Sequence, residues 1–216
     1  MDGESIHIPK GLNLLVDIDE SPEINALIVE GSLIFAPNVT DKTHHRKFHA
    51  HYIFVSGGTM EVGTAEFPYD SKITITMYGT ISDPYLPLYG NKCIGLREAT
   101  LDMHGAVKQP TWTVMKDTAE AGSSTITLSM PVDWVVGDEI SIASTSYNSR
   151  EAEQRTIKAI TASDTYPVLT LDKPLEYRHF AGTEEYGAKK IDMRAEVGLL
   201  TRSVVFKGED EHTVDN

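Results

Sequence analysis

Short apolar stretches, separated by glycine, proline, asparagine and aspartate, run along the whole chain. They are rich in Ile, Val, Leu, Thr and aromatic residues, a composition typical of β-strands. No stretch has the longer periodicity of a convincing helix. We therefore predict an all-β protein with strands at residues 6–8, 24–35, 52–62, 73–78, 125–130, 139–143, 168–171 and 199–206.

The strands of the first half carry an internal rhythm. An apolar strand, a glycine break and a second apolar strand occur in residues 27–35 and again in residues 53–62. Four glycines in this rhythm are spaced by 26, 22 and 26 residues: Gly31, Gly57, Gly79 and Gly105. One coil of a parallel β-helix has roughly this length, so we predict stacked right-handed coils that share a core. A β-sandwich with long loops is the alternative.

The rhythm stops after residue 105. Trp134 and Gly137 mark a tight turn, and the strands around it indicate a compact antiparallel meander or small barrel. The strand-then-glycine form resumes near residue 194. We predict glycine-punctuated coils at 1–105, an inserted antiparallel subdomain at 106–193 and a return to the coil at 194–216, all within one module.

Charge narrows the choice of partners. The 216-residue chain has 32 acidic and 19 basic residues and a net charge of -13, so its long-range field repels nucleic acid and anionic membranes. The same field argues against a simple electrostatic grip on an acidic polysaccharide, although a local basic patch stays possible. No apolar run approaches the roughly 18–20 residues of a spanning helix, so we expect no direct membrane insertion.

Two features point to different compartments. A single cysteine, Cys93, excludes an internal disulfide framework and favours a reducing environment, where it would act as a small buried hydrophobe. Asn38, followed by Val39 and Thr40, is an N-glycosylation acceptor, which matters only in a secreted chain. The first residues of the sequence lack the basic, apolar and small-residue succession of a signal peptide, so we expect none here. Composition alone leaves the compartment open.

Several blocks together carry a family resemblance. They are DGESIHIP (2–9), LLVD (14–17), GGTMEVGT (57–64), ITITMYG (73–79) and RAEVGLLTR (194–202). These blocks resemble the eight-glycine domain shared by the fibrocystin, fibrocystin-L and cell migration-inducing hyaluronan-binding protein family, and the last is most similar to the fibrocystin-L branch. The glycines of the third block, Gly57, Gly58 and Gly63, would be structural.

The resemblance implies a cell-surface or secreted protein in which this module leads into a longer β-helix of the pectin-lyase type. The chain would then be a fragment of a larger glycoprotein, with Met1 an added start. Some family members bind or cut hyaluronan, whereas the fibrocystin branch resembles receptors and cell-coat components. A hyaluronan-degrading glycosidase and a structural coat unit, at the cell surface or on cilia, are therefore the alternatives to a non-catalytic recognition module.

Half of the eight histidines lie in the stretch THHRKFHAHY, residues 43–52. Alternation along a strand places His49 and His51 on one face, about 7 Å apart at Cα, together with Ile53 and Val55. Two imidazoles are weak zinc candidates, because a zinc site needs three or four ligands and no third is evident. We expect Arg46 and Lys47 to lie in the preceding loop with the first two histidines.

The basic loop and the two strand histidines form the predicted contact surface. Arg46, Lys47, His49 and His51 make the most basic spot of an acidic chain, so we predict that they touch a glycan such as hyaluronan or a protein partner at the cell surface. Their imidazoles would make this contact sensitive to pH. We predict no cofactor and no metal.

Other polar clusters have structural interpretations. Asp17, Asp19 and Glu20 suggest calcium only weakly, because the glycine turn and the following glutamate of an EF-hand are missing. No pattern typical of nucleotide binding, esterase chemistry or thiol redox occurs. With 32 acidic residues, a carboxylate pair at glycosidase spacing carries no signal.

The segment after the insertion alternates charged and apolar residues. We predict that Arg194 and Arg202 pair with Glu196 to lock a coil, with Gly198 as a structural glycine. An anion-binding site built on the same arginines is the alternative.

Overall fold

The computed structural model describes residues 3–86 and 88–209 and confirms the all-β class. The only helix in these ranges is a single 3-10 turn, η1 (Ser149–Glu151). None of the described segments forms a helix with the length and apolar character needed to cross a bilayer. The chain divides into two compact units: the first joins the described residues up to Val107 to those from Arg202 onward, and the second is Lys108–Thr201.

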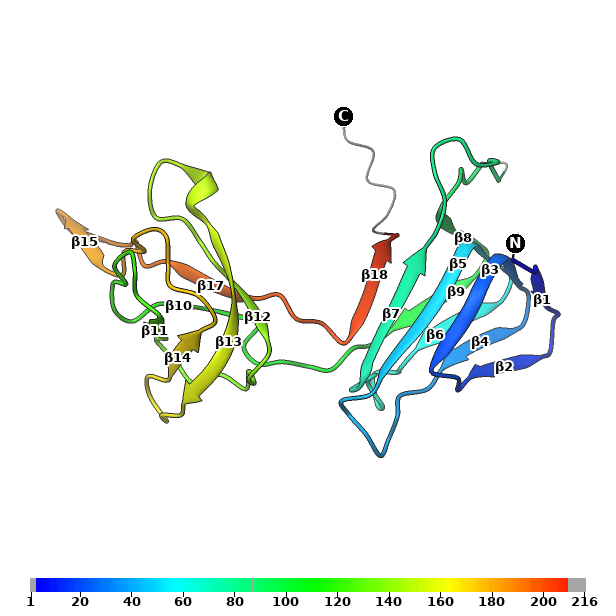
Figure 1. Cartoon of the computed structure of the whole chain (residues 1–216), viewed down its shortest axis with the longest axis horizontal. Helices are drawn as coiled ribbons and strands as arrows, with labels where there is room; N and C mark the ends of the chain where they lie inside the picture. The colour runs from blue at the N-terminus through cyan, green and yellow to red at the C-terminus, as the bar shows by residue number, and fades with distance from the viewer. Residues whose placement is uncertain (1–2, 87, 210–216) are drawn as a thin grey trace. The chain divides into compact units, whose positions relative to one another are not determined.

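Two sheets build the first unit, and every strand pair in them is parallel (Figure 1). The larger sheet has the order β1 (Ile6–Ile8), β3 (Glu20–Val29), β5 (His45–Ser56), β7 (Lys72–Met77), β18 (Val204–Gly208), and β8 (Cys93–Arg97) pairs with the second half of β5. The smaller sheet has the order β2 (Asn13–Val16), β4 (Ser32–Phe35), β6 (Thr59–Val62), β9 (Thr100–Met103).

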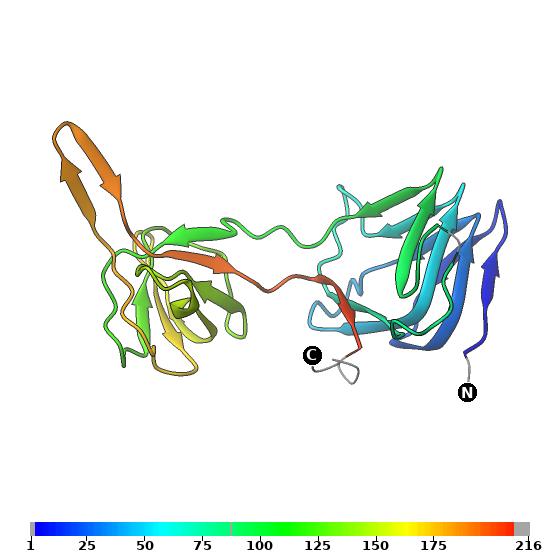
Figure 2. The same cartoon turned by 90° about the horizontal axis from the view of Figure 1, so that it is seen from above.

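Apolar side chains from equivalent strand positions stack in the first core. In the strand register Leu27 lies beside Ile53, and Leu33 lies beside Met60; all four are at most 1% exposed. Burial of each such side chain stabilises the fold by roughly 1.5–3 kcal/mol. Figure 2 shows the successive strands of each sheet following one another along this stack. The rhythm of the sequence therefore reflects side-chain positions that recur from one strand to the next.

Close backbone approach explains two of the predicted structural glycines. A Cβ on Gly58 would lie 2.4 Å from the carbonyl oxygen of Gly31, and a Cβ on Gly31 would lie 2.1 Å from that of Leu12. A Cβ on Gly105 would meet the Ser203 hydroxyl at 2.7 Å. The predicted glycines with positive φ are Gly57, Gly63, Gly79 and Gly137. Gly198 has open space around its Cβ position, so packing gives no reason for glycine there.

The close contact at Gly58 gives a stability prediction. Gly58→Ala should destabilise the first unit by about 1–3 kcal/mol, because the new methyl group meets backbone that cannot rotate away. The measurement is urea unfolding followed by circular dichroism. The matched control is Gly198→Ala, which has open space and should change stability little. Equal stability of the Gly58→Ala and wild-type proteins would contradict the close stacking.

The second unit is antiparallel. Its sheet has the order β10 (Trp112–Val114), β17 (Glu196–Leu199), β12 (Glu139–Ile142), β13 (Glu153–Thr161), β14 (Val168–Leu171), β11 (Thr125–Thr127). A separate hairpin pairs β15 (Thr183–Tyr186) with β16 (Lys189–Asp192). Ile140, Ile142, Leu169 and Val197 are fully buried in its core.

The predicted return to the first unit comes too early at residue 194. Strand β17 pairs with β10 and β12, and Val197 and Leu199 are buried in the second core. The first unit resumes at Arg202, and β18 then pairs with β7. The strand-then-glycine form of residues 194–198 resembled the coils, but the buried partners of Val197 are those of the antiparallel sheet.

Candidate binding face of the first unit

The histidine-rich stretch lies mostly within strand β5. His45, Arg46 and Lys47 already belong to the strand, so the prediction that they lie in a loop is wrong. Alternation places Lys47 and His49 on the outer face and Arg46 and Phe48 on the inner face. The outer face of β5 therefore carries part of the predicted contact surface, without Arg46.

Arg46 is buried on the inner face of β5, so its side chain is not part of the outer surface of this strand. It is 5% exposed. Its Nε atom donates to the carbonyl of Ile18 at 2.7 Å, and its Nη1 atom donates to the carbonyl of Ala36 at 2.6 Å. Further bonds run from Nη2 to the Asp17 carbonyl at 3.1 Å and from Nη1 to the Tyr69 hydroxyl at 3.3 Å. The guanidinium thus joins three carbonyls from two loops to the inside of β5.

The strand alternation changes phase after His51. Tyr52 and Ile53 are both buried, and from there Ile53 and Val55 point into the core. The prediction that these two share a face with His49 and His51 is therefore wrong. The change coincides with the switch of partner on this side of β5, since its first half pairs with β7 and its second half pairs with β8.

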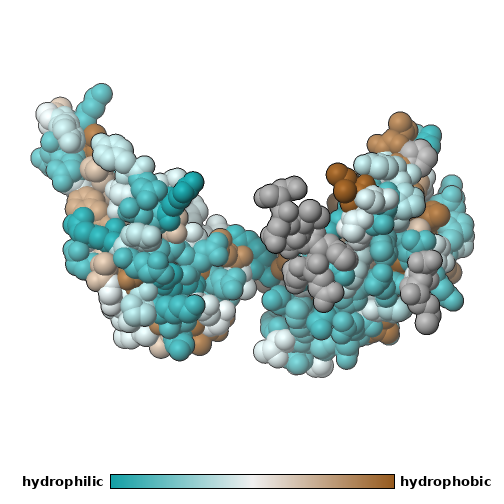
Figure 3. Space-filling model, turned by 45° about the horizontal axis from the view of Figure 1, so that its top comes forward, coloured by the Kyte–Doolittle hydropathy of each residue, from teal (hydrophilic) through white to brown (hydrophobic). Residues whose placement is uncertain are grey.

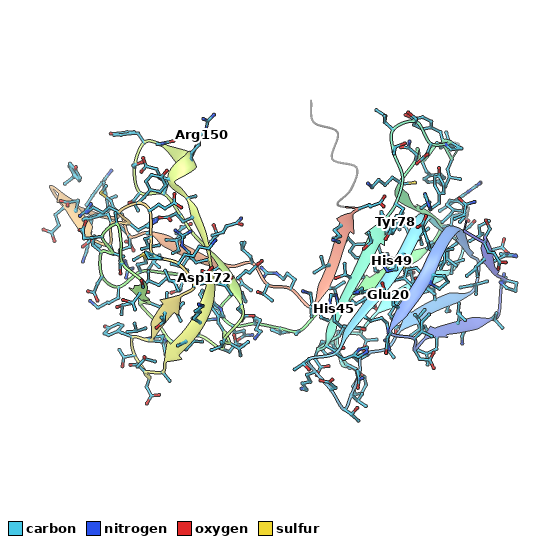
Figure 4. All side chains as sticks on the ribbon, in the orientation of Figure 1. Glu20, His45, His49, Tyr78, Arg150 and Asp172 are labelled. Carbon is cyan, nitrogen blue, oxygen red and sulfur yellow. The ribbon has the colours of Figure 1, made fainter. Side chains whose placement is uncertain are left out.

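A chain of hydrogen bonds crosses the outer face from β3 to the end of β7. The Nε2 atom of His49 lies 3.1 Å from a carboxylate oxygen of Glu20, and its Nδ1 atom lies 3.1 Å from the Tyr78 hydroxyl. Figure 4 shows these three side chains on the same side of the sheet. A neutral His49 that donates to Glu20 and accepts from Tyr78 satisfies both contacts. The imidazole is therefore held in one orientation.

Glu20 also pairs with Lys47, whose Nζ atom lies 3.3 Å from its second carboxylate oxygen. Hydrogen bonds from His49 and then Lys47 lower the pKa of Glu20 below its ordinary value. Burial raises the pKa of Tyr78, which keeps its phenol protonated. Tyr78 is thus a hydrogen-bond donor and not an activated nucleophile.

His45 lies at one end of this face. Its Nε2 atom is 2.9 Å from the Thr74 hydroxyl, and Lys72 is its direct neighbour in the register of β7. Burial, followed by the charges of Lys72 and Lys47, lowers the pKa of His45. This end of the face is therefore locally cationic and resists a further positive charge.

These side chains line one open groove of about 710 Å³. The floor includes Thr74 and Thr76, which are 7% and 5% exposed. The groove is lined by Glu20, His45, Lys47, His49, Lys72, Thr74, Thr76, Tyr78, Val205, Lys207 and Glu209. We call it the β5 groove. Lys72 and Lys207 add two cations that sequence reasoning missed.

His51 lies outside the β5 groove. Its Nε2 atom is 2.7 Å from a carboxylate oxygen of Glu23, and its ring lies 6.4 Å from that of Tyr52. It lines a separate depression of about 660 Å³ with Asp83 and Tyr85. The structure therefore keeps Lys47 and His49 together, places His51 beside them and removes Arg46.

The described side chains of this face do not form a group that could hold a metal ion. The described residues contain no group of three or more His, Cys, Asp or Glu side chains that could hold a metal ion. His49 and His51 each turn toward a different carboxylate. Asp19 pairs with His44, and Glu20 pairs with His49, so the weak calcium candidates point to separate partners.

Asn38 lies in the loop between β4 and β5. Its side-chain oxygen accepts from the backbone N–H of Thr40 at 3.1 Å and from the Thr40 hydroxyl at 2.9 Å. Val39 is 84% exposed. The acceptor tripeptide therefore forms an exposed polar turn, and its glycosylation stays a prediction.

The predicted ion pair at residue 194 has a different partner. Arg194 binds Asp192 through Nε and Nη2, at 2.6 Å for the shortest contact, whereas Glu196 is an exposed residue of β17. Arg202 is exposed and belongs to the first unit.

Trp134 is 4% exposed, and its indole N–H donates to the Pro110 carbonyl at 2.7 Å. Cys93 is only partly buried, and burial raises the pKa of its thiol.

The second unit holds a buried charged cluster that sequence reasoning missed. His179 is fully buried, with Nδ1 at 2.9 Å from the Ala143 carbonyl and Nε2 at 2.9 Å from a carboxylate oxygen of Glu153. Glu153, 5% exposed, also accepts from Arg155 and from the N–H groups of Glu176 and Tyr177. Both ring nitrogens of His179 thus face oxygen acceptors, and either can donate when it carries a hydrogen. We call this group of side chains the Glu153 cluster.

The side of the surface that Figure 3 shows has no large apolar patch on the first unit that could be an alternative binding site to the β5 groove. In Figure 3 the first unit is mainly hydrophilic on this side, and its apolar atoms lie in scattered spots. A polar ligand suits such a surface better than an apolar one.

Comparison with known proteins places the chain in a family. Residues 1–116 match the G8 domain. Fibrocystin-L of Mus musculus is 36% identical over 213 residues, and that of Homo sapiens is 33% identical over 211 residues; each alignment covers 97% of this chain. Fibrocystin of Mus musculus is 32% identical over 213 residues, which cover 96% of this chain. The chain spans about 5% of the length of these relatives.

Proposed function

Because the chain belongs to the G8 domain family, which includes fibrocystin-L-like proteins, we propose that it is a non-catalytic recognition module of a large extracellular protein. The groove on β5 is the proposed contact site, and a glycan is the proposed ligand. The observation that carries this proposal is a groove of about 710 Å³ whose polar side chains come from neighbouring parallel strands. Side chains held on paired strands keep their spacing, which lowers the entropic cost of binding.

The chemistry of the β5 groove suits a saccharide. Thr74 and Thr76 supply hydroxyl groups, and Glu20 and His49 supply acceptors and donors already fixed by their mutual hydrogen bond. Tyr78 offers a ring with a polar tip. Such a mixture matches the alternating hydroxyl groups and apolar faces of a sugar ring.

Local charge favours an acidic saccharide such as hyaluronan. Lys47, Lys72 and Lys207 line the β5 groove against two carboxylates, although the whole chain carries a net charge of -13. Short-range pairing with these ammonium groups can hold a uronate carboxylate where the long-range field opposes it. A protein partner with acidic side chains is the other ligand class that this charge fits.

We also propose that the two parallel sheets are coils of a right-handed β-helix of the pectin-lyase type. The matched registers of β3 with β5 and of β4 with β6 support it, because each apolar position stacks on its equivalent. An extracellular setting is supported by the family and by the exposed acceptor turn at Asn38. In a longer protein, further coils would extend this stack.

The proposed binding site has a direct variant test. Lys47→Gln with Lys72→Gln should weaken binding of hyaluronan oligosaccharides by about ten-fold or more, since two charge-assisted contacts are lost. Binding is measured by calorimetry at fixed salt. The matched control is Lys10→Gln with Lys189→Gln, two exposed lysines that do not line the β5 groove.

Two outcomes would contradict the site. Equal weakening of hyaluronan binding by the two double variants would show that the loss depends on overall charge and not on the β5 groove. Absence of binding by the wild-type chain would remove hyaluronan as the ligand, and a panel of neutral oligosaccharides and acidic peptides would then identify the class.

A further inference from the structure

A second cationic groove belongs to the second unit and shares no lining residue with the β5 groove. It has a volume of about 530 Å³ and is lined by Lys116, Ala181, Gly182, Thr183, Lys190, Asp192 and Arg194. We propose that this groove binds a tetrahedral oxyanion, the sulfate group of a glycan, through Lys116, Lys190 and Arg194. We call it the Lys116 groove. It extends the proposed function to a second site.

Backbone pairing fixes the frame of the Lys116 groove. Met115 donates to the carbonyl of Ala195 at 2.9 Å, and Met193 donates to that of Gly182 at 3.0 Å. Lys116, the strand end at Arg194 and the segment at Gly182 are therefore held side by side. Lys190 and Asp192 are alternate residues of β16 and share one face of that strand, and Arg194 follows two residues beyond the end of the strand.

Arg194 is held in place and still has donors to offer. Asp192 takes its Nε and Nη2 atoms, with contacts of 2.9 Å from Nε and 2.6 Å from Nη2. Hydrogen bonds from Arg194 lower the pKa of Asp192 to about 2, so this carboxylate stays charged and paired. The Nη1 atom makes no hydrogen bond to any described residue. An ordered guanidinium with a free edge is suited to an oxyanion.

Lys116 and Lys190 add positive charge to the groove, and the charge of Lys190 also helps to lower the pKa of the nearby Asp192 carboxylate. Neither Lys116 nor Lys190 forms an ion pair within residues 3–86 and 88–209. The Lys116 ammonium lies 5.1 Å from the ring centre of Tyr166, which holds it near the groove. Glu185 is the cross-strand neighbour of Lys190 in the hairpin, but it does not line the groove. Three cations and one carboxylate line the groove, which leaves it with a net positive charge.

The geometry favours a tetrahedral group over a planar one. The three cations come from separate segments: Lys116 follows β10, Lys190 belongs to β16, and Arg194 lies beyond its end. Donors from several directions can each meet a different oxygen of a sulfate, whereas a carboxylate offers two oxygens in one plane. The Thr183 hydroxyl adds a neutral donor. The choice of a glycan as carrier rests on the proposed extracellular setting, and the oxyanion chemistry does not.

The test uses the whole chain and defined probes at fixed ionic strength. A sulfated heparin-derived tetrasaccharide should bind, and its desulfated counterpart should bind at least ten-fold more weakly. Lys116→Gln with Lys190→Gln should weaken binding of the sulfated probe by about ten-fold or more. Lys158→Gln with Lys189→Gln removes the same charge from exposed positions outside the groove and should change binding less than two-fold.

The outcomes separate the possible errors. Equal weakening by the two double variants would overturn the site. Binding of inorganic sulfate but not of the sulfated tetrasaccharide would overturn the choice of a glycan as carrier. Tighter binding of an aspartate-rich peptide than of the sulfated tetrasaccharide would indicate a protein partner instead. In Lys47→Gln with Lys72→Gln the sulfated probe should still bind at least ten-fold more tightly than its desulfated counterpart, so failure of the β5 groove and failure of the Lys116 groove are distinguishable.

Discussion

Replacing Arg46 with alanine is expected to destabilise the first unit by about 3–4 kcal/mol, because it strands buried acceptors that each cost about 1–3 kcal/mol. The guanidinium donates to the carbonyls of Asp17, Ile18 and Ala36, and no other donor can take its place from β5. Lysine at this position keeps the charge and loses the planar fork. Arg46→Lys should therefore recover only part of the lost stability.

Amide hydrogen exchange across β5 measures this effect within the first unit. The matched control is the neighbour Lys47→Ala, which removes an exposed cation and should change stability by less than about 0.5 kcal/mol. Similar protection of β5 in Arg46→Ala and in Lys47→Ala would contradict the assigned role. A binding defect in Arg46→Ala without loss of protection would restore Arg46 as a ligand contact.

The second large effect concerns the Glu153 cluster. Glu153→Gln keeps the shape of the side chain and removes the charge that faces His179 and Arg155, so it should destabilise the second unit by about 3–5 kcal/mol at neutral pH. Trp112 and Trp134, the two tryptophans of the chain, belong to the second unit, so their fluorescence follows its unfolding. Glu184→Gln, at an exposed position of β15 in the same unit, is the control.

The same substitution has a defined pH dependence. Burial acts to raise the pKa of Glu153, but the N–H of Glu176, the ring of His179 and the N–H of Tyr177 outweigh it and lower the pKa below 4.5. A carboxyl with a lowered folded pKa contributes stability above its unfolded value and loses that contribution as the pH falls through the folded value. The difference between wild type and Glu153→Gln should therefore be full above about pH 5 and shrink below pH 4. A difference that is constant with pH would contradict an ionised Glu153.

Local pattern located many of the strands but not their partners, and not all of the strands: β2, β15 and β16 were not predicted, and the predicted strand 199–206 crosses the gap between β17 and β18. Alternation and glycine spacing located β6, β7 and the second half of β5, because burial repeats every second residue along a strand. The same local form misplaced residues 194–201. Whether Val197 faces the first core or the second depends on pairing with β10 and β12, which lie more than fifty residues earlier.

Sequence reasoning found only part of the candidate site, again because the sequence pattern does not specify which strands pair. Lys47 and His49 could be recognised because they share one strand and one face. Lys72 and Tyr78 join them only through the register of β7, which the strand pattern could not specify. The inward turn of Arg46 followed from alternation once β5 was known to begin at His45. His179 and Glu153 are 26 residues apart with no linking motif, so only the fold could show them as a pair.

The most direct measurement of the central proposal is an NMR titration of the isotope-labelled chain with a short hyaluronan oligosaccharide. The β5 groove predicts saturable shifts concentrated at Lys47, His49, Lys72 and Tyr78, with smaller changes at His51 and none in the second core. Saturable shifts that cluster outside the β5 groove, or spectra unchanged at millimolar oligosaccharide, would contradict it.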